Sequence, residues 1–321
     1  MHERRADGCY IKGINMFLPR KSRFRKYLVP VVLWSAALAA FGWYSGWLER
    51  SAYQLMIVTA GESATRLGLE SYRVGIDALP LTGVAENASG LTYHPGRNSL
   101  FSVINQPAKI VELAVDGTLK RTISVEGVAD LEGITHVRGN EFFLADERTQ
   151  QLIHVEISDD QTVVSTQGRP RLGLAFDLAG NLGFEGVSWD HTQKRLFVVK
   201  EKRPLRLFEL YGLAAALDGH KLDLQIREWF PRGSAALLLR DLSSLTYHED
   251  SGNMLLLSDE SRLVVELGAE RQPSGMLVLR KGWHGLTRDV PQAEGIAVGP
   301  RGEIFLISEP NLFYRFDPPP R

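Results

Sequence analysis

The chain has 321 residues, of which 44% are hydrophobic and 23% charged, and its formal net charge at pH 7 is −1. Residues 1–50 carry nine Lys and Arg against three Asp and Glu, which leaves −7 for the remainder. A mildly acidic globular part argues against nucleic acid as a partner, because nucleic-acid-binding proteins carry a clustered basic face.

A basic cluster followed by an apolar run comes first along the chain. Residues 20–26 contain five Lys and Arg, and residues 27–48 contain no charge. A run of this length can span a bilayer, which needs about 20 residues, and basic residues before it place the N-terminus in the cytoplasm. A cleaved signal peptide is the alternative, but its apolar core is usually shorter. We expect a disordered cytoplasmic segment over 1–26, a transmembrane helix over 27–48 and a linker over 49–71.

Cys9 is the single cysteine and precedes the apolar run, so the exported part has no disulfide. The stability of that part must come from apolar burial, which about 250 residues can supply. Met16 is an alternative start, because residues 1–15 show no apolar periodicity.

One short pattern then recurs five times: an apolar strand, a polar turn and a second apolar strand that ends in Asn or Glu. The copies cover 90–105, 133–147, 186–201, 244–260 and 295–309. A strand-built period of roughly 40–50 residues is typical of a β-propeller.

Each unit is expected to add two outer strands, for example 109–115 and 119–125 in the first unit and 151–157 and 162–166 in the second. An insertion over 211–219 in the third unit is expected to form a short helix. The fifth unit ends after residues 312–316, and residues 72–79 offer the missing strand. We therefore predict an all-β fold, a five-bladed propeller of four-stranded antiparallel blades over 72–317. The N-terminal strand closes the last blade, and 318–321 form a tail.

The residues that enter the first strand and leave the second strand of each unit are expected to lie at one mouth of the central channel. They form a ring of seven glutamates and two aspartates: Glu132, Glu185, Glu294, Asp146, Glu147, Glu201, Asp259, Glu260 and Glu309. Crowded carboxylates raise one another's pKa, and such a ring calls for a cation or basic groups. Oxygen-only ligands favour a hard ion such as Ca²⁺. Solvated loop tips, balanced by Arg148, Lys202 and Arg203, are the alternative.

The Glu-Gly pairs at 132–133, 185–186 and 294–295 resemble the SdiA-regulated, YjiK-like family, as do the strand endings at 145–148, 199–201, 258–261 and 308–310 and the N-terminal apolar run. The resemblance covers essentially 72–316 and the membrane segment. It implies a five-bladed propeller in the periplasm, anchored in a bacterial inner membrane, with a calcium site at the acidic face, and it implies no particular reaction. Ser89 and Ser243 stand where that pattern has glutamate.

Four histidines, His94, His136, His191 and His248, recur near the turn between the first two strands. That turn lies at the opposite mouth, and we expect these histidines to be structural. No Gly-x-Ser-x-Gly elbow, His-Glu-x-x-His helix or phosphate-binding glycine loop is present in the sequence.

Three functions remain open. The chain could be a calcium-ordered binding or interaction module with an unknown protein or small-molecule ligand at its acidic face. It could be a calcium-dependent hydrolase, similar to the lactonase and phytase propellers, or its acidic face could be purely structural. Propellers host many activities, so fold alone does not choose among these.

Overall fold

The computed structural model describes residues 22–60, 65–84, 86–174, 183–201, 204–229 and 238–320. The chain divides into two units, Met1–Leu48 and Glu49–Arg321. Most of the expected cytoplasmic segment, with Cys9 and Met16, lies outside the described residues, as do Lys202 and Arg203.

Helix α1 (Ser22–Tyr44) occupies the apolar run in the first unit. Its apolar side chains, Val29, Leu33 and Trp34 among them, are exposed. Among the helices of the described residues, none combines the length and the apolar character that crossing a membrane requires. The membrane anchor therefore stays a prediction.

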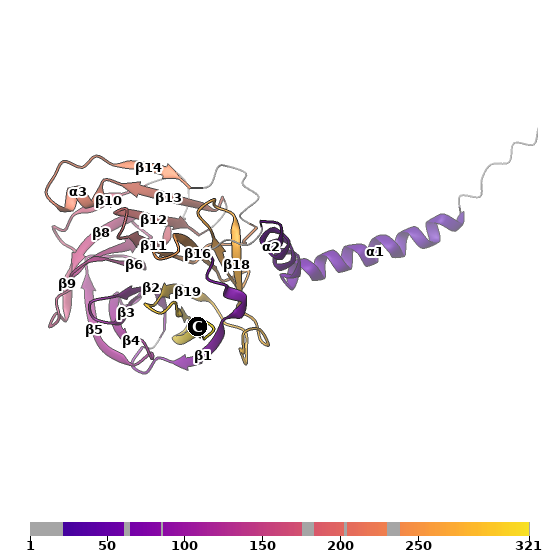
Figure 1. Ribbon diagram of the computed structural model, residues 1–321, viewed down its shortest axis with the longest axis horizontal. Helices are drawn as coiled ribbons and strands as arrows, with labels where there is room; N and C mark the ends of the chain where they lie inside the picture. Colours follow the sequence, from indigo (N-terminus) through magenta and orange to yellow (C-terminus); the bar gives the residue numbers. More distant parts are fainter. Residues whose placement is uncertain are drawn as a thin grey trace, which may run out of the picture. The chain divides into compact units, whose positions relative to one another are not determined.

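Five sheets make up the second unit (Figure 1). Blade 1 holds β2 (Ala88–His94), β3 (Ser99–Ile104), β4 (Lys109–Ala114) and β5 (Leu119–Glu126). Blade 2 holds β6 (Leu131–Arg138), β7 (Glu141–Asp146), β8 (Gln151–Glu156) and β10 (Arg171–Gly173). Blade 3 holds β11 (Phe184–Asp190), β12 (Arg195–Lys200), β13 (Arg206–Tyr211) and β14 (Gln225–Glu228), with α3 (Leu213–Leu217) between the last two. Blade 4 holds β15 (Ser244–His248), β16 (Asn253–Ser258), β17 (Leu263–Leu267) and β18 (Pro273–Val278).

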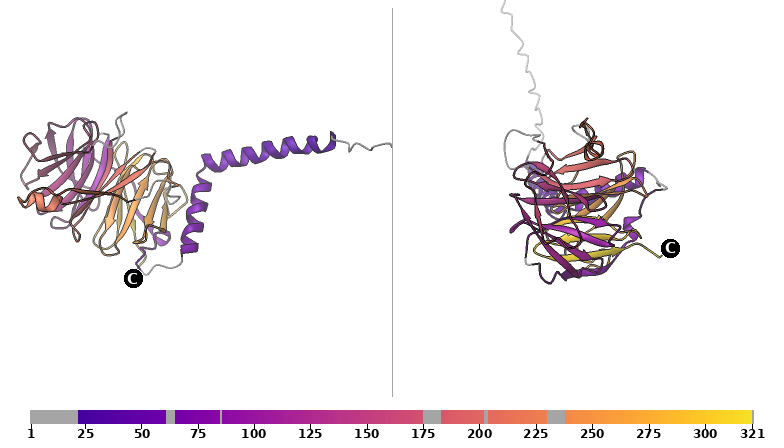
Figure 2. Two further views of the ribbon diagram at one scale, coloured as in Figure 1. Left: turned by 90° about the horizontal axis from the view of Figure 1, so that it is seen from above. Right: turned by 90° about the vertical axis from the view of Figure 1, so that its left-hand side faces the viewer.

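Blade 5 confirms the predicted closure. It combines β19 (Ala293–Val298), β20 (Ile304–Ser308) and β21 (Leu312–Asp317) with β1 (Arg73–Pro80) from the other end of the sequence. Strand β1 runs antiparallel to β21, and Arg73 pairs with Asp317. The five innermost strands contact one another in a closed ring, and Figure 2 shows the sheets from two further sides.

One predicted strand belongs to a different blade. Residues 162–166 were expected to complete the second unit, but β9 (Val163–Ser165) pairs in parallel with β5 of blade 1. Val164 is buried with Ile123 and Val125 in the cluster between blades 1 and 2, and the Thr166 hydroxyl donates to the carbonyl of Glu126 at 2.9 Å. These contacts hold β9 on blade 1, and β10 takes the outer place in blade 2.

Apolar packing between neighbouring blades forms the core. Each of five buried clusters joins two successive blades, and the fifth joins blade 5 back to blade 1. In β3, Leu100 faces blade 5 while Phe101 faces blade 2. The middle strands are apolar on both faces for this reason.

The segment treated from sequence as a linker contains helix α2 (Trp47–Ala60) and a short 3-10 helix, Leu69–Ser71. Tyr53 is fully buried against blade 4, and its hydroxyl accepts a hydrogen bond from the Leu238 amide at 3.0 Å. Glu49 is paired with Arg240 at 2.5 Å. Residues of α2 from Glu49 onward are thus packed on the propeller.

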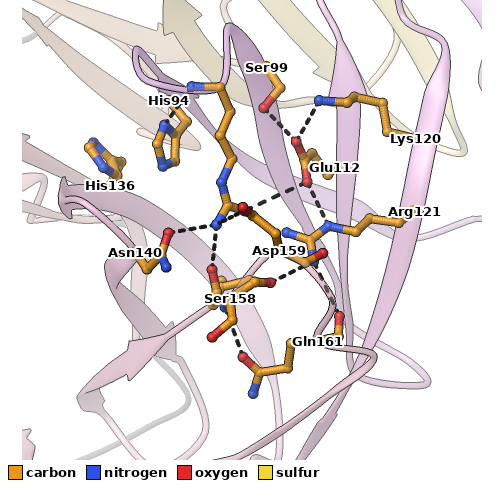
Figure 3. A network of polar contacts seen from close by, with 12 residues as sticks. His94, Ser99, Glu112, Lys120, Arg121, His136, Asn140, Ser158, Asp159 and Gln161 are labelled. Carbon is orange, nitrogen blue, oxygen red and sulfur yellow. Dashed lines mark hydrogen bonds and ion pairs between the residues drawn. The ribbon is translucent and has the colours of Figure 1, made fainter.

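A buried polar network joins blade 1 to the loop after β8 of blade 2 (Figure 3). Glu112 accepts from Ser99 and Lys120 at 2.8 Å and from Arg121 at 2.6 Å. Arg121 also donates to the carbonyl of Ser158 at 2.7 Å. Burial opposes ionisation of Glu112, but hydrogen bonds from Lys120, Arg121 and Ser99 lower its pKa to about 2.

Glycines set how closely the inner strands approach at one mouth of the channel. A Cβ added to Gly133 would lie 3.0 Å from the carbonyl oxygen of Glu185, in the next blade. A Cβ at Gly186 would lie 2.9 Å from the Cα of Ser244, again in the next blade. The residue after each inward glutamate must therefore be glycine.

We expect Gly295→Ala to lower the free energy of unfolding by about 1–3 kcal/mol, as overpacking of a tight site does. The added Cβ would lie 2.6 Å from Ile307 Cγ2 and 2.9 Å from the carbonyl carbon of Gly90. Urea unfolding of the full chain measures the effect.

The matched control is Gly173→Ala in β10, where nothing lies within 4 Å of the added Cβ. It should stay within about 0.5 kcal/mol of wild type. Equal stability of the two variants would contradict the close approach of the inner strands.

Candidate functional site

The three glutamates of the Glu-Gly pairs stand at β-bulges. In blade 2, Leu131 pairs with Asp146 and Gly133 with Ala145, which leaves Glu132 unpaired between them. The same shift leaves Glu185 unpaired in β11 and Glu294 unpaired in β19. A bulge re-aims a side chain and is frequent beside functional sites. The same device therefore presents a glutamate at one mouth in three of the five blades.

The three glutamates lie close enough for the charge of one to act on another. Burial raises the pKa of Glu185 well above its usual value, and the charges of Glu132 and Glu294 raise it further, although they belong to blades 2 and 5. Burial raises the pKa of Glu294 to about 8, with contributions from Asp259, Glu309 and Glu132. The inner-strand glutamates of blades 2, 3 and 5 therefore act on one another electrostatically, and their binding of a metal ion stays a prediction.

Hydrogen bonds tie Glu132 to blade 1. Asn105, the residue that leaves β3, donates from Nδ2 to Glu132 Oε1 at 2.5 Å, and the Ser89 hydroxyl donates to the Glu132 carbonyl at 3.0 Å. Burial and the charges of Asp130 and Glu147 outweigh these bonds and raise the pKa of Glu132 to about 7. In blade 4 the Ser243 hydroxyl donates to the Ala293 carbonyl at 2.7 Å. Both serines therefore join neighbouring blades.

The carboxylates that leave the second strands have other partners. Asp146 accepts from the amides of Ala129 at 3.0 Å and Asp130 at 3.2 Å, so it orders the loop that enters β6. Asp259 accepts from the amide of Ala293 at 3.2 Å, at the start of the next blade. Their oxygens hold backbone in place at the mouth, a role that the sequence pattern does not distinguish from metal binding.

The remaining predicted carboxylates are less enclosed than Glu185. Glu147 Oε1 accepts from the amide of Gly183 at 3.2 Å, which links blade 2 to blade 3. Burial and the charges of Glu86 and Asp259 raise the pKa of Glu309. The side chains of Glu201 and Glu260 lie at the ends of their hairpins, and Glu260 is exposed.

Two further aspartates belong to this mouth and were missed by the sequence analysis. Asp241 is 2% exposed, accepts from the amide of Glu260 at 3.2 Å, and has a pKa that burial raises to about 6. Asp130 is buried and pairs with Arg148 at 3.2 Å. Each stands two residues before the position that enters the first strand, in Asp-Leu-Glu-Gly and Asp-Leu-Ser-Ser, and that recurrence could have identified both.

Charge balance at this mouth is partial in the described residues. Arg148 neutralises Asp130, as expected for a basic residue at this face. Lys200, at the end of β12, is 2% exposed. Across the described ranges, no set of three His, Cys, Asp or Glu side chains is arranged to hold a metal ion.

The opposite mouth is hollow. A cavity of about 580 Å³ lies among the carboxyl ends of the inner strands, lined by Tyr93, His136, Trp189, His191 and Tyr247 among others. Glu249 also lines it, and its carboxylate accepts from the His191 amide at 2.7 Å. Three of the four recurring histidines, His136, His191 and His248, line this cavity, and the ring of His94 lies beside that of His136, as their place in the repeat predicts.

Comparison with protein-family models identifies the family to which this propeller belongs. The model of the SdiA-regulated family matches residues 64–317, which includes every blade and the three Glu-Gly bulges. The chain belongs to the SdiA-regulated family. The match begins within the segment that precedes β1 and ends at the last residue of β21.

Among solved structures, this SdiA-regulated protein is similar to a luciferin-regenerating enzyme at 11% identity and a TM-score of 0.48, over 76% of this chain and 95% of that one. It is also similar to a streptogramin B lyase at 9% identity and a TM-score of 0.46, over 78% and 99%. A virginiamycin B lyase from Staphylococcus aureus gives 11% identity and a TM-score of 0.39, over 74% and 68%.

We expect Glu294→Gln to stabilise the metal-free propeller at alkaline pH. The pKa of Glu294 is raised on folding, so its contribution to stability is complete below about pH 4.5 and is lost as the pH rises through about 8. The variant should equal wild type near pH 4 and exceed it by about 2–4 kcal/mol near pH 9. Urea unfolding in chelator across this range measures the difference.

Glu270→Gln, in the exposed turn between β17 and β18, is the matched control and should stay within about 0.5 kcal/mol of wild type. A constant difference between Glu294→Gln and wild type at all pH values would show that folding does not raise the pKa of Glu294.

Proposed function

We propose that this chain is a membrane-anchored periplasmic propeller that binds a ligand at its acidic mouth, with Ca²⁺ ordering that mouth. The observation that carries the proposal is that bulges in three blades present Glu132, Glu185 and Glu294 at one mouth. There the charges of Glu132 and Glu294 raise the pKa of the buried Glu185, and the charge of Glu132 raises the pKa of Glu294. At neutral pH such a cluster must hold protons or attract a cation.

The donor set at this mouth suits a hard ion. The described groups that converge are carboxylates, with hydroxyls and backbone carbonyls beside them and neither thiol nor imidazole. Calcium accepts six to eight oxygens in flexible geometry, and carboxylates that titrate near pH 7–8 can exchange their protons for it.

Calorimetric titration of the full chain with Ca²⁺, after chelator treatment, tests the calcium site. We expect binding, a rise in melting temperature with the ion because only the folded state holds the site, and a loss of at least about tenfold in affinity in Glu132→Gln, Glu185→Gln or Glu294→Gln. The variants remove charge but keep volume, so the ring should stay folded.

The control is again Glu270→Gln, which lies on the opposite face and should titrate like wild type. An unchanged titration in all three inward variants would remove these glutamates as ligands. If wild type binds no calcium, the acidic mouth is a metal-free platform and the search moves to protein partners.

The anchor is supported by helix α1, in which most of the apolar run 27–48 lies, and by the five basic residues of 20–26 that precede this run. The positive-inside rule then places the propeller in the periplasm of a cell with an inner membrane. We expect alkaline phosphatase fused after Arg321 to be active and β-galactosidase fused at the same place to be inactive. The reverse pattern would place the propeller in the cytoplasm.

A calcium-dependent hydrolase is the second candidate, and the pKa of Glu132 favours it. A carboxyl with a pKa of about 7 can act as a general base at neutral pH, and a bound Ca²⁺ could polarise a carbonyl or phosphoryl oxygen. Calcium-dependent turnover of lactones or phosphate esters that disappears in Glu132→Gln would select this candidate over a binding module.

A further inference from the structure

The histidine side of the channel contains an arrangement that neither the family nor the acidic mouth accounts for. His191 Nε2 lies 3.3 Å from His136 Nδ1, although the two residues belong to blades 3 and 2. Both side chains line the 580 Å³ cavity. Two ring nitrogens from separate blades thus face each other at its wall.

In each ring, the nitrogen that does not face the other histidine already has a hydrogen-bond partner. His136 Nε2 lies 3.1 Å from the carbonyl oxygen of Gly139, which can only accept, so this nitrogen carries a proton and Nδ1 presents a lone pair. His191 Nδ1 lies 2.5 Å from Glu249 Oε1 and donates to that carboxylate. The inner nitrogens, His136 Nδ1 and His191 Nε2, can therefore bind a ligand that both of them reach or form a hydrogen bond with each other.

We propose that His136 Nδ1 and His191 Nε2 form a binding site for a divalent transition-metal ion such as Zn²⁺. Two nitrogens bound to tetrahedral zinc at 2.0–2.1 Å are about 3.3–3.4 Å apart, which matches the observed separation. Histidine ligands typically donate their other N–H to a carboxylate or backbone carbonyl, which is the role of Glu249 and Gly139 here.

The surroundings of the pair keep the imidazole lone pair available. His136 is 4% exposed, and its contact with the Gly139 carbonyl holds the ring proton on Nε2. The ring of His94 lies beside that of His136, with centroids 4.2 Å apart and the planes tilted by 38°, and Figure 3 shows the two rings next to each other. His94 donates from Nε2 to Gly139 at 2.8 Å and accepts from the Arg97 amide at Nδ1, so it supports the ring and is no ligand.

Two protein nitrogens leave coordination positions that face the cavity. Water or an exogenous ligand with a metal-binding oxygen or nitrogen would complete the shell there. This differs from the acidic mouth in every respect: the donors are nitrogens, the ion is borderline rather than hard, and the site lies at the other end of the inner strands. The proposal does not depend on calcium binding.

The same distance also fits a direct hydrogen bond between the two rings, and the experiment separates the two readings. If His191 donates to both His136 and Glu249, its ring is an imidazolium. The proton between the two rings then occupies the position proposed for the metal ion. A metal ion would replace that proton, so binding should release protons and weaken as the pH falls.

Zinc titration by calorimetry and copper(II) electron paramagnetic resonance test the proposal on the full chain, purified without a polyhistidine tag. We expect one ion per chain and copper spectra with nitrogen couplings from two imidazoles. His191→Asn should weaken zinc binding at least tenfold and remove one coupling. Glu249→Gln should weaken it about 10- to 100-fold with both couplings kept, as outer partners of metal ligands do.

His220→Asn is the matched control, because His220 is exposed and lies away from the cavity, and it should bind zinc like wild type. His136→Asn is the second test of the zinc site, and its melting temperature reports whether this variant folds. The side chain of His191 is 41% exposed, so the loss of this histidine should leave the fold intact. Absence of zinc binding, or binding unchanged in both histidine variants, would overturn the proposal and leave an imidazole–imidazole hydrogen bond.

Discussion

The close approach of neighbouring inner strands at the acidic mouth is the constraint on which the rest of the propeller depends. The glycines at 133, 186 and 295 let each inner strand touch backbone or Cβ atoms of the next blade, at distances where a Cβ would collide. Because the strands come so near, the residue before each glycine is forced out of the ladder as a bulge and its side chain turns to the channel. Closure of the ring and crowding of carboxylates are thus two results of one geometry.

The two mouths of the channel differ in chemistry because they gather different positions of the same repeat. The acidic mouth gathers the beginnings of the inner strands with their glutamates and the ends of the second strands with their loop-ordering aspartates, whereas the ends of the inner strands and the turns after them bring histidines, aromatic rings and Glu249. Buried polar pairs inside the blades form a further set of contacts. Ser99 with Glu112, Glu141 with His154 and Asn253 with Glu266 join the second and third strands of blades 1, 2 and 4.

Alternating apolar residues, turn residues and the period were enough to predict the five blades and the strand that closes them, because these signals are local or repeated. The sheet to which β9 belongs could not be predicted, since three residues with Val163 and Val164 suit either blade and only Thr166 and the interblade cluster decide. At the site, the inward direction of Glu132, Glu185 and Glu294 followed from the repeat. The use of Asp146 and Asp259 as backbone acceptors depends on loop positions that only the folded chain defines.

Pairing of Arg73 with Asp317 has a consequence for biosynthesis. Strand β1 is made first among the strands and its partner β21 last, so the contact of greatest sequence separation is also the last that can form. Until then β1 lacks its partner, and the sheet that will receive it presents an open edge on which another chain can pair. The interval between synthesis of the first and the last strand is therefore when this protein is most exposed to aggregation, and blade 5 is where a chaperone would be needed.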